Sequence, residues 1–196
     1  IMWCYCGPKE SYEEAFAPIK KFTSETPPII DGTHWSTYAE LNAAFNGLYP
    51  SGDQWYWKGD YFDKITEEVI DIHAKNALEL PSWKSAMHLY PVNGKAHEVE
   101  AENTAWNNRN STYSMVIAGV DPDPSKFSTL KKWASKYWRE LNPYSGSAGG
   151  YVNFMMDDEG LDRVKATYGT NYKKLVDIKR KYDPENLFRL NQNIVP

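Results

Sequence analysis

Apolar residues recur every three or four positions along much of this chain, which is the spacing of a helix with one buried face. The clearest apolar stripe follows Pro124 and consists of Phe127, Leu130, Trp133, Ala134, Tyr137, Trp138 and Leu141. The pattern predicts helices over residues 11–22, 37–45, 125–141, 161–168 and 171–181, and one more through Ile65, Val69, Ile72 and His73.

Local signals mark several of the expected helix ends. Thr37 and Glu40 have the spacing of a capping box. Asp60 has a side chain suited to cap the helix that follows it. Pro18 cannot donate a backbone amide hydrogen bond, so we expect the helix over 11–22 to kink or restart there.

Between the helices the apolar period changes to two, which is typical of strands with one buried face. We predict strands over 1–6, 54–59, 85–90, 96–101, 112–120 and 151–154, with a hairpin across 91–94. In the last of these strands Tyr151 and Asn153 would share one face, because strand side chains alternate. Strands separated first by helices and then following one another indicate an α+β fold, with a largely antiparallel sheet and helices packed on one face.

The amino-acid composition excludes some classes of binding partner. The 196 residues carry 22 Lys and Arg against 26 Asp and Glu, a net charge of −4, so no basic surface favours nucleic acid. The sequence has neither a signal-peptide pattern nor an apolar run of roughly eighteen residues, so we expect no membrane association. The 8 Trp and 14 Tyr suit either a ligand pocket or a core.

The residues that most often bind metals are few. Cys4 and Cys6 have no second cysteine pair nearby, and their spacing favours two buried thiols over a zinc site or a disulfide. The four histidines, His34, His73, His88 and His97, show no metal-ligand spacing, and none is assigned a chemical role.

The last 48 residues combine several motifs in a fixed order. YVNF at 151–154 is followed by YG-x-NY at 168–172, IK-x-KYDP at 178–184 and NQNI at 191–194. This order resembles the C-terminal segment of the berberine-bridge-enzyme-like branch of FAD-linked oxidases, and weaker similarities extend over essentially the whole chain.

The resemblance implies a division of the chain and a cofactor. Residues 1–148 would be a substrate-domain portion, and residues 149–196 the segment that packs back on the flavin domain of the same protein. FAD would be bound mainly by an N-terminal domain outside this sequence, so we expect this part alone to be inactive. The whole enzyme would oxidise an alcohol, sugar or secondary metabolite by hydride transfer to the flavin, with oxygen as acceptor.

The resemblance also implies roles for individual residues. Tyr151 matches a tyrosine that serves as, or assists, the general base beside the flavin, and Asn153 matches a flavin-contacting asparagine. The alternatives are a tyrosine that only packs and an asparagine with a structural hydrogen bond.

Three more residues are candidate substrate contacts. Val116 falls where plant members place a catalytic carboxylate or glutamine, and valine has no proton chemistry, which leaves Tyr151 as the main candidate base. Trp57 and Lys58 lie in an aromatic strand that could line the pocket, with sheet packing as the alternative.

A second hypothesis treats the chain as a stand-alone ligand-binding or scaffold module without a flavin domain. In the first hypothesis the partners are a small-molecule substrate and the flavin domain. In both we expect exposed sheet edges to favour self-association, because unpaired backbone groups template further pairing.

Overall fold

The computed structural model describes residues 1–146 and 149–196 of the chain. These residues form two compact units, Ile1–Phe45 and Asn46–Pro196, which are described separately. The boundary that we predict between residues 148 and 149 touches Ala148, which lies outside the described residues, and it stays a prediction.

The first unit contains α1 (Tyr12–Glu25) and α2 (Tyr38–Ala43). The capping box is confirmed, since the Thr37 hydroxyl accepts from the Glu40 amide and the Glu40 carboxylate accepts from the Thr37 amide. α1 continues through Pro18 as one helix to Glu25, beyond the expected end.

Two expectations for the start of this unit are wrong. Residues 1–6, all described, form no strand, and Cys4 and Cys6 are exposed free thiols rather than buried ones. A strand needs a neighbouring strand to accept and donate its backbone hydrogen bonds, and an alternating sequence does not by itself provide that neighbour.

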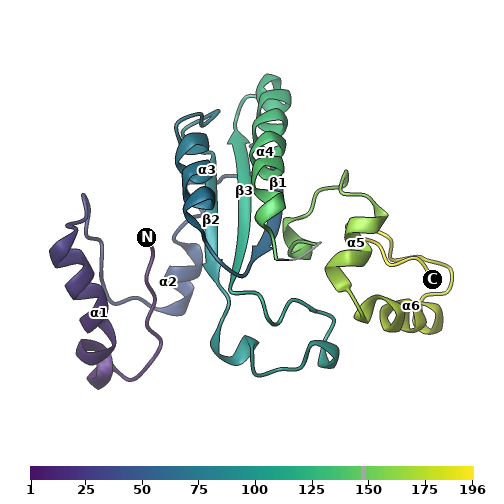
Figure 1. Ribbon diagram of the computed structural model, residues 1–196, viewed down its shortest axis with the longest axis horizontal. Coiled ribbons are helices and arrows are strands. Elements are labelled where there is room, and N and C mark those ends of the chain that lie inside the picture. Colours follow the sequence, from purple (N-terminus) through teal and green to yellow (C-terminus); the bar gives the residue numbers. More distant parts are fainter. Residues whose placement is uncertain (147–148) are drawn as a thin grey trace. The chain divides into compact units, whose positions relative to one another are not determined.

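The second unit is built on a three-stranded antiparallel sheet of β1 (Gln54–Phe62), β2 (Ala86–Pro91) and β3 (Tyr113–Asp121). The strand order is β1-β3-β2, so β3 is central (Figure 1). Opposite residues in the register include Gly59 with Val116 and Val116 with His88.

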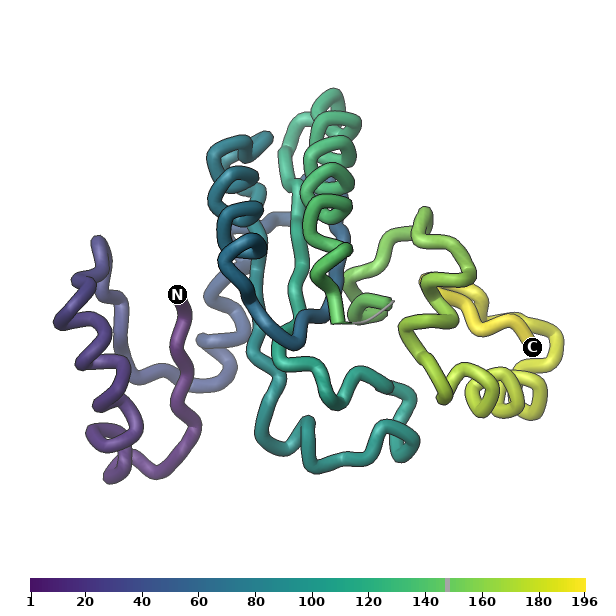
Figure 2. The backbone as a smooth tube through the Cα atoms, in the orientation of Figure 1, coloured from purple at the N-terminus to yellow at the C-terminus, as the bar shows by residue number. Residues whose placement is uncertain are grey.

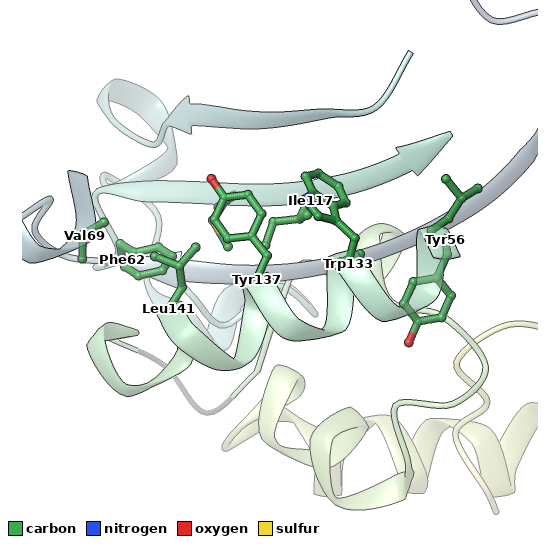
Figure 3. Close-up of a cluster of buried hydrophobic side chains, with 10 residues drawn as sticks. Tyr56, Phe62, Val69, Ile117, Trp133, Tyr137 and Leu141 are labelled. Atoms are coloured by element: carbon green, nitrogen blue, oxygen red, sulfur yellow. The ribbon is translucent and has the colours of Figure 1, made fainter. Parts of the chain in front are cut away.

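One face of the sheet is covered by α3 (Glu67–Ala77) and α4 (Phe127–Leu141), which run side by side across it (Figure 1). Trp133, Tyr137 and Leu141 of α4 point at the sheet, where they meet Phe62 of β1 and Ile117 of β3 (Figure 3). This apolar layer is the core of the unit, and it confirms the α+β class with an antiparallel sheet and helices on one face.

The chain between β2 and β3 departs from the expected hairpin and strand. It forms a long loop with two 3-10 helices, Gly94–Ala96 and Ala101–Asn103, so the predictions for 91–94 and 96–101 are wrong. In 96–101 the only large apolar residue is Val99, so the segment has little apolar face to bury and lacks the usual reason to pair.

Two further local predictions are wrong. Asp60 does not cap a helix but lies buried inside β1, and Thr66 caps α3 instead. Residues Val152–Phe154 form a 3-10 helix rather than a strand.

The C-terminal part adds α5 (Leu161–Tyr168) and α6 (Asn171–Tyr182), close to the expected ranges. After α6 the chain turns back, and the Gln192 amide donates to the carbonyls of Met155 and Met156 (Figure 2). In the part of the chain that the structure describes, no helix is long and apolar enough to cross a membrane.

Candidate active site on the distal face of the sheet

Side chains of the three strands alternate between two faces. Those that point away from α3 and α4 define what we call the distal face. Its residues are Trp55, Trp57, Gly59 and Tyr61 of β1, Ala86, His88 and Tyr90 of β2, and Ser114, Val116, Ala118 and Val120 of β3.

The centre of the distal face is a row of three residues in register. Gly59, Val116 and His88 lie opposite one another on β1, β3 and β2. A Cβ atom on Gly59 would come within 2.8 Å of Phe154 Cβ, so glycine is what lets Phe154 lie on the sheet. Val116 is buried, and His88 is the exposed end of the row.

Tyr151 and Asn153 meet at the rim of this face. The Asn153 side-chain amide donates to the Tyr151 hydroxyl at 2.8 Å. The strand that would have put them on one face does not form, yet the turn through Val152–Phe154 brings the two side chains together all the same. The 3-10 helix therefore achieves locally what strand alternation was expected to do.

A ladder of ring contacts links this rim to the edge strand. The Tyr151 ring packs edge-on against Phe154 at 5.1 Å between centroids, and Phe154 stacks on Tyr90 at 5.9 Å. The Tyr90 hydroxyl lies 2.8 Å from His88 Nδ1. Residues from β2 and from the C-terminal segment thus share one aromatic surface.

Tyr61 lies under this surface and is held in its neutral form. Burial raises its pKa to about 12, and the nearby Tyr151 adds to that rise. The Trp106 indole donates to the Tyr61 hydroxyl at 2.8 Å, and the Arg109 guanidinium stacks on Trp106 at 4.5 Å. A neutral phenol here can orient neighbours but does not take up protons.

Two buried polar atoms on the distal face lack a hydrogen-bond partner among the described residues. They are Nε1 of Trp57 and Oγ of Ser114. Buried polar groups are normally satisfied, so orphans on one face suggest that something binds there. Trp57 also packs edge-on against Trp55 at 5.7 Å between ring centroids.

Lys58 lies on the other face of the sheet from Trp57 and Val116. Its ammonium forms ion pairs with Glu159 at 2.9 Å and Asp158 at 3.2 Å. Burial lowers the pKa of Lys58, but the hydrogen bond and charge of Glu159, with help from Asp158, outweigh it and hold the pKa above its ordinary value. Its role as a substrate contact stays a prediction, and the structure does not bring it to the distal face.

The ion pairs of Lys58 belong to a network that fastens the C-terminal segment to β1. Arg163 pairs with Glu159 at 2.7 Å and donates to the Gly59 carbonyl. Burial opposes ionisation of Asp158, but hydrogen bonds from Lys131, Tyr56 and Lys58 lower its pKa to about 2. The C-terminal segment therefore contacts β1 on both faces of the sheet. The ion-pair network lies on the helix-covered face, and Phe154 packs on the distal face.

Sequence reasoning missed His88, Tyr90 and Ser114. Their alternation along predicted strands was visible, but it could not reveal which residues oppose one another. The predicted hairpin paired 85–90 with 96–101, whereas β2 pairs with β3. Only that register places His88 beside Val116.

Comparison with known proteins adds a family. Residues 150–195 match the family described as Berberine and berberine like. An FAD-linked oxidoreductase of Dictyostelium discoideum is 28% identical over 198 residues, covering 100% of this chain and 42% of that protein. Reticuline oxidase of Papaver somniferum is 27% identical over 146 residues, covering 62% of this chain and 27% of the oxidase. The chain thus spans less than half the length of these relatives.

Solved structures share the fold. Physcomitrella patens BBE-like 1 superposes with a TM-score of 0.75 at 20% identity, over 98% of this chain and 43% of that one. Berberine bridge enzyme from Eschscholzia californica gives a TM-score of 0.77 at 16% identity, over 97% and 44%. Together with the sequence matches, these findings show that the chain is related to the berberine-bridge-enzyme-like FAD-linked oxidoreductases and corresponds to a C-terminal portion of them.

Proposed function

We propose that this chain forms the substrate-binding part of an FAD-dependent oxidoreductase, and that substrate and flavin meet at the distal face. The observation that carries the proposal is the Tyr151 hydroxyl, held at 2.8 Å by Asn153 beside an aromatic surface. The family relationship supports the choice of cofactor. In this proposal residues 1–148 are the substrate-domain portion, and residues 149–196 are the segment that packs back on the flavin domain.

The side chains of the distal face suit a flavin. A planar tricyclic ring needs a flat apolar surface and polar atoms near its edge, and the stacked Tyr90 and Phe154 rings and the orphaned Ser114 hydroxyl offer both. Asn153 and Tyr151 would hold one edge of the ring, since an amide can donate and accept. When bound, the flavin accepts a hydride from the substrate carbon.

The substrate in this proposal is an alcohol, a sugar or another hydroxylated metabolite. Its C–H bond gives up a hydride while its O–H proton goes to an acceptor in the protein, which leaves a carbonyl product. A bound flavin would take up the two electrons and pass them to oxygen, with peroxide as the reduced product. The Tyr151 hydroxyl binds the reacting hydroxyl, as base or as the partner of a base, and the hydrogen bond from Asn153 stabilises negative charge on its oxygen.

The other predicted contacts have narrower roles. Trp57 and Val116 shape the substrate side of the pocket, and the Trp57 indole supplies a free donor. Lys58 could reach a substrate only by leaving its ion pairs with Glu159 and Asp158. The outer edge of β2 is the part of the sheet that would support self-association.

The test uses the whole protein, purified with its flavin domain. We expect its absorption spectrum to show flavin, and we expect one of D-glucose, cellobiose, benzyl alcohol or cinnamyl alcohol to bleach that flavin without oxygen. Tyr151→Phe should slow bleaching by about 10²–10⁴-fold, the usual worth of positioned proton transfer. Tyr182→Phe, at the exposed end of α6, is the matched control.

Two results would count against the proposal. If the whole protein binds no flavin, the stand-alone binding module becomes the better account. If Tyr151→Phe and Tyr182→Phe reduce the flavin equally fast, Tyr151 has no part in the chemistry.

A further inference from the structure

The proposed function needs a proton acceptor, and the position at the centre of the distal face cannot be one. Val116 carries only methyl groups, and Gly59 beside it has no side chain. Opposite Val116 on its other side lies His88, whose Cβ is expected within about 4.5–5.5 Å of the valine Cβ. The imidazole is thus the proton-binding group of this row.

We propose that His88 is the general base for the hydroxyl of the substrate, and that Tyr90 is its positioning residue. The inference rests on the proposed function, because it concerns the same ligand and the same face. It assigns Tyr151 the part of a hydrogen-bond partner at the other end of the ring ladder rather than that of the base.

The contact between His88 and Tyr90 occupies Nδ1 and leaves Nε2 as the ring nitrogen available to the substrate. Nδ1 lies 2.8 Å from the Tyr90 hydroxyl, and Tyr90 is itself held by stacking on Phe154. The hydrogen bond that one ring nitrogen makes decides the state of the other. When Nδ1–H donates to the phenol oxygen, Nε2 carries a free lone pair and is the atom that accepts a proton.

The surroundings of His88 favour its neutral form. Although His88 is the exposed end of the row, desolvation by the protein around its ring lowers the pKa of the imidazole, so the ring is neutral and able to accept a proton at neutral pH. The titratable group in contact with it is the phenol of Tyr90, which in turn interacts with the phenol of Tyr49, and a phenol ordinarily ionises at a much higher pH than an imidazole. An ionisation near or below pH 6.5 would therefore report His88 and not its neighbours.

The proton and electron balance of the step is closed. The substrate O–H bond breaks and its proton goes to His88 Nε2, which becomes an imidazolium. The adjacent C–H bond breaks as a hydride, the carbon is oxidised by two electrons to a carbonyl, and the bound flavin is the oxidant. The imidazolium then returns its proton to water.

The test compares variants of the whole flavin-containing protein with the same four alcohols and sugars. His88→Gln should slow anaerobic flavin bleaching by about 10²–10⁴-fold, and added imidazole should restore part of the rate in His88→Ala. The wild-type rate should fall as the pH drops through the pKa of His88, and His88→Gln should lack that dependence. His97→Gln is the control, because the His97 ring donates from Nε2 to the Ser111 carbonyl in the loop between β2 and β3.

A second readout does not depend on turnover. In protein labelled with ¹⁵N-histidine and reduced beforehand with dithionite, the four compounds can bind but cannot react. We expect the Nε2 resonance of His88 to shift on adding the compound that bleaches fastest, and the Nδ1 resonance to change in Tyr90→Phe.

The outcomes separate this inference from the proposed function. If a substrate bleaches the flavin of His88→Gln as fast as that of the wild type, or if the His88 resonance does not shift, the role of His88 is wrong. The oxidase proposal would still stand. A flavin that none of the four compounds bleaches contradicts the oxidase proposal, and the role of His88 falls with it.

Discussion

The two faces of the same sheet differ in the charges that they bury, although among the described residues unpartnered buried polar atoms lie on both sides, with His73 Nε2 and Asn76 Oδ1 of α3 on the helix-covered one. On the helix-covered face, Lys58 is buried and fully matched by Glu159 and Asp158. On the distal face, Ser114 Oγ and Trp57 Nε1 are buried without a partner among the residues that the structure describes. The buried charges thus lie with their partners on the helix-covered face, and the distal face, which carries no charged residue of the described strands, is the one on which we propose that ligands bind.

The carboxylate of Asp60 is a second buried charge on the helix-covered face that has hydrogen-bond partners. Burial raises its pKa, and hydrogen bonds from Ser145 and Asn142 offset part of that rise, while the Trp138 indole also donates to the carboxylate at 3.0 Å. These donors come from α4 and the segment after it, some eighty positions along the chain. The helix layer is therefore anchored to β1 by polar contacts as well as by apolar packing.

Of the substitutions considered, we expect removal of the Glu159 charge to reduce the stability of the helix-covered face most. Its carboxylate side chain is 2% exposed and faces both Lys58 and Arg163. We expect Glu159→Gln to cost about 3–5 kcal/mol of unfolding free energy, because it strands buried positive charge. Urea denaturation measures the change, and Asp157→Asn, at an exposed neighbouring position, is the control. A cost below about 1 kcal/mol, typical of a surface pair, would refute the buried network.

A pair of neighbouring substitutions on β3 sharpens the comparison. Ile117 points into the core, so Ile117→Ala should cost about 2–5 kcal/mol of stability. Val116→Ala removes one fewer carbon from the distal face and should cost about 1.5 kcal/mol, while changing the rate of flavin bleaching more than its neighbour does. Urea denaturation measures the loss of stability in each variant, and anaerobic bleaching of the same samples measures the change in the rate of flavin reduction. Equal effects on bleaching would erase the difference between the faces.

The smallest expected effect concerns acid pH. The pKa of Asp158 is about 2 when folded, against 3.8 ordinarily. Its ion pairs therefore stabilise the fold above about pH 4, and that contribution is lost as the pH falls toward 2. Because the side chain is 37% exposed, we expect at most about 1 kcal/mol. Asp158→Asn should flatten the stability profile between pH 5 and 2, roughly the window set by linkage; an unchanged profile would show that the pairs contribute nothing.

Much of the fold was predictable from local pattern. The stripe of α4, the central strand β3 and the ranges of α5 and α6 follow from local pattern. α4 buries one face, and β3 is buried at every position between its two end residues. Asp60 shows where this reasoning ends. Its side chain favours a helix cap locally, yet donors that are distant in sequence make a buried position in β1 more favourable.

The candidate site divides in the same way. Tyr151 and Asn153 were found through resemblance, although the strand expected to align them is a 3-10 helix. His88 could not be predicted from the sequence. Its position beside Val116 depends on the pairing of β2 with β3, which a loop of over twenty residues separates along the chain. Register is a property of the folded sheet, and alternation along one strand does not reveal it.

The most direct test of the two-face account is a crystal structure of the whole protein with FAD bound. We expect the flavin ring over the distal face, next to Tyr151 and Asn153 and within reach of the row formed by Val116 and His88. A flavin that contacts the helix layer of α3 and α4, or that lies away from the sheet altogether, would contradict the account.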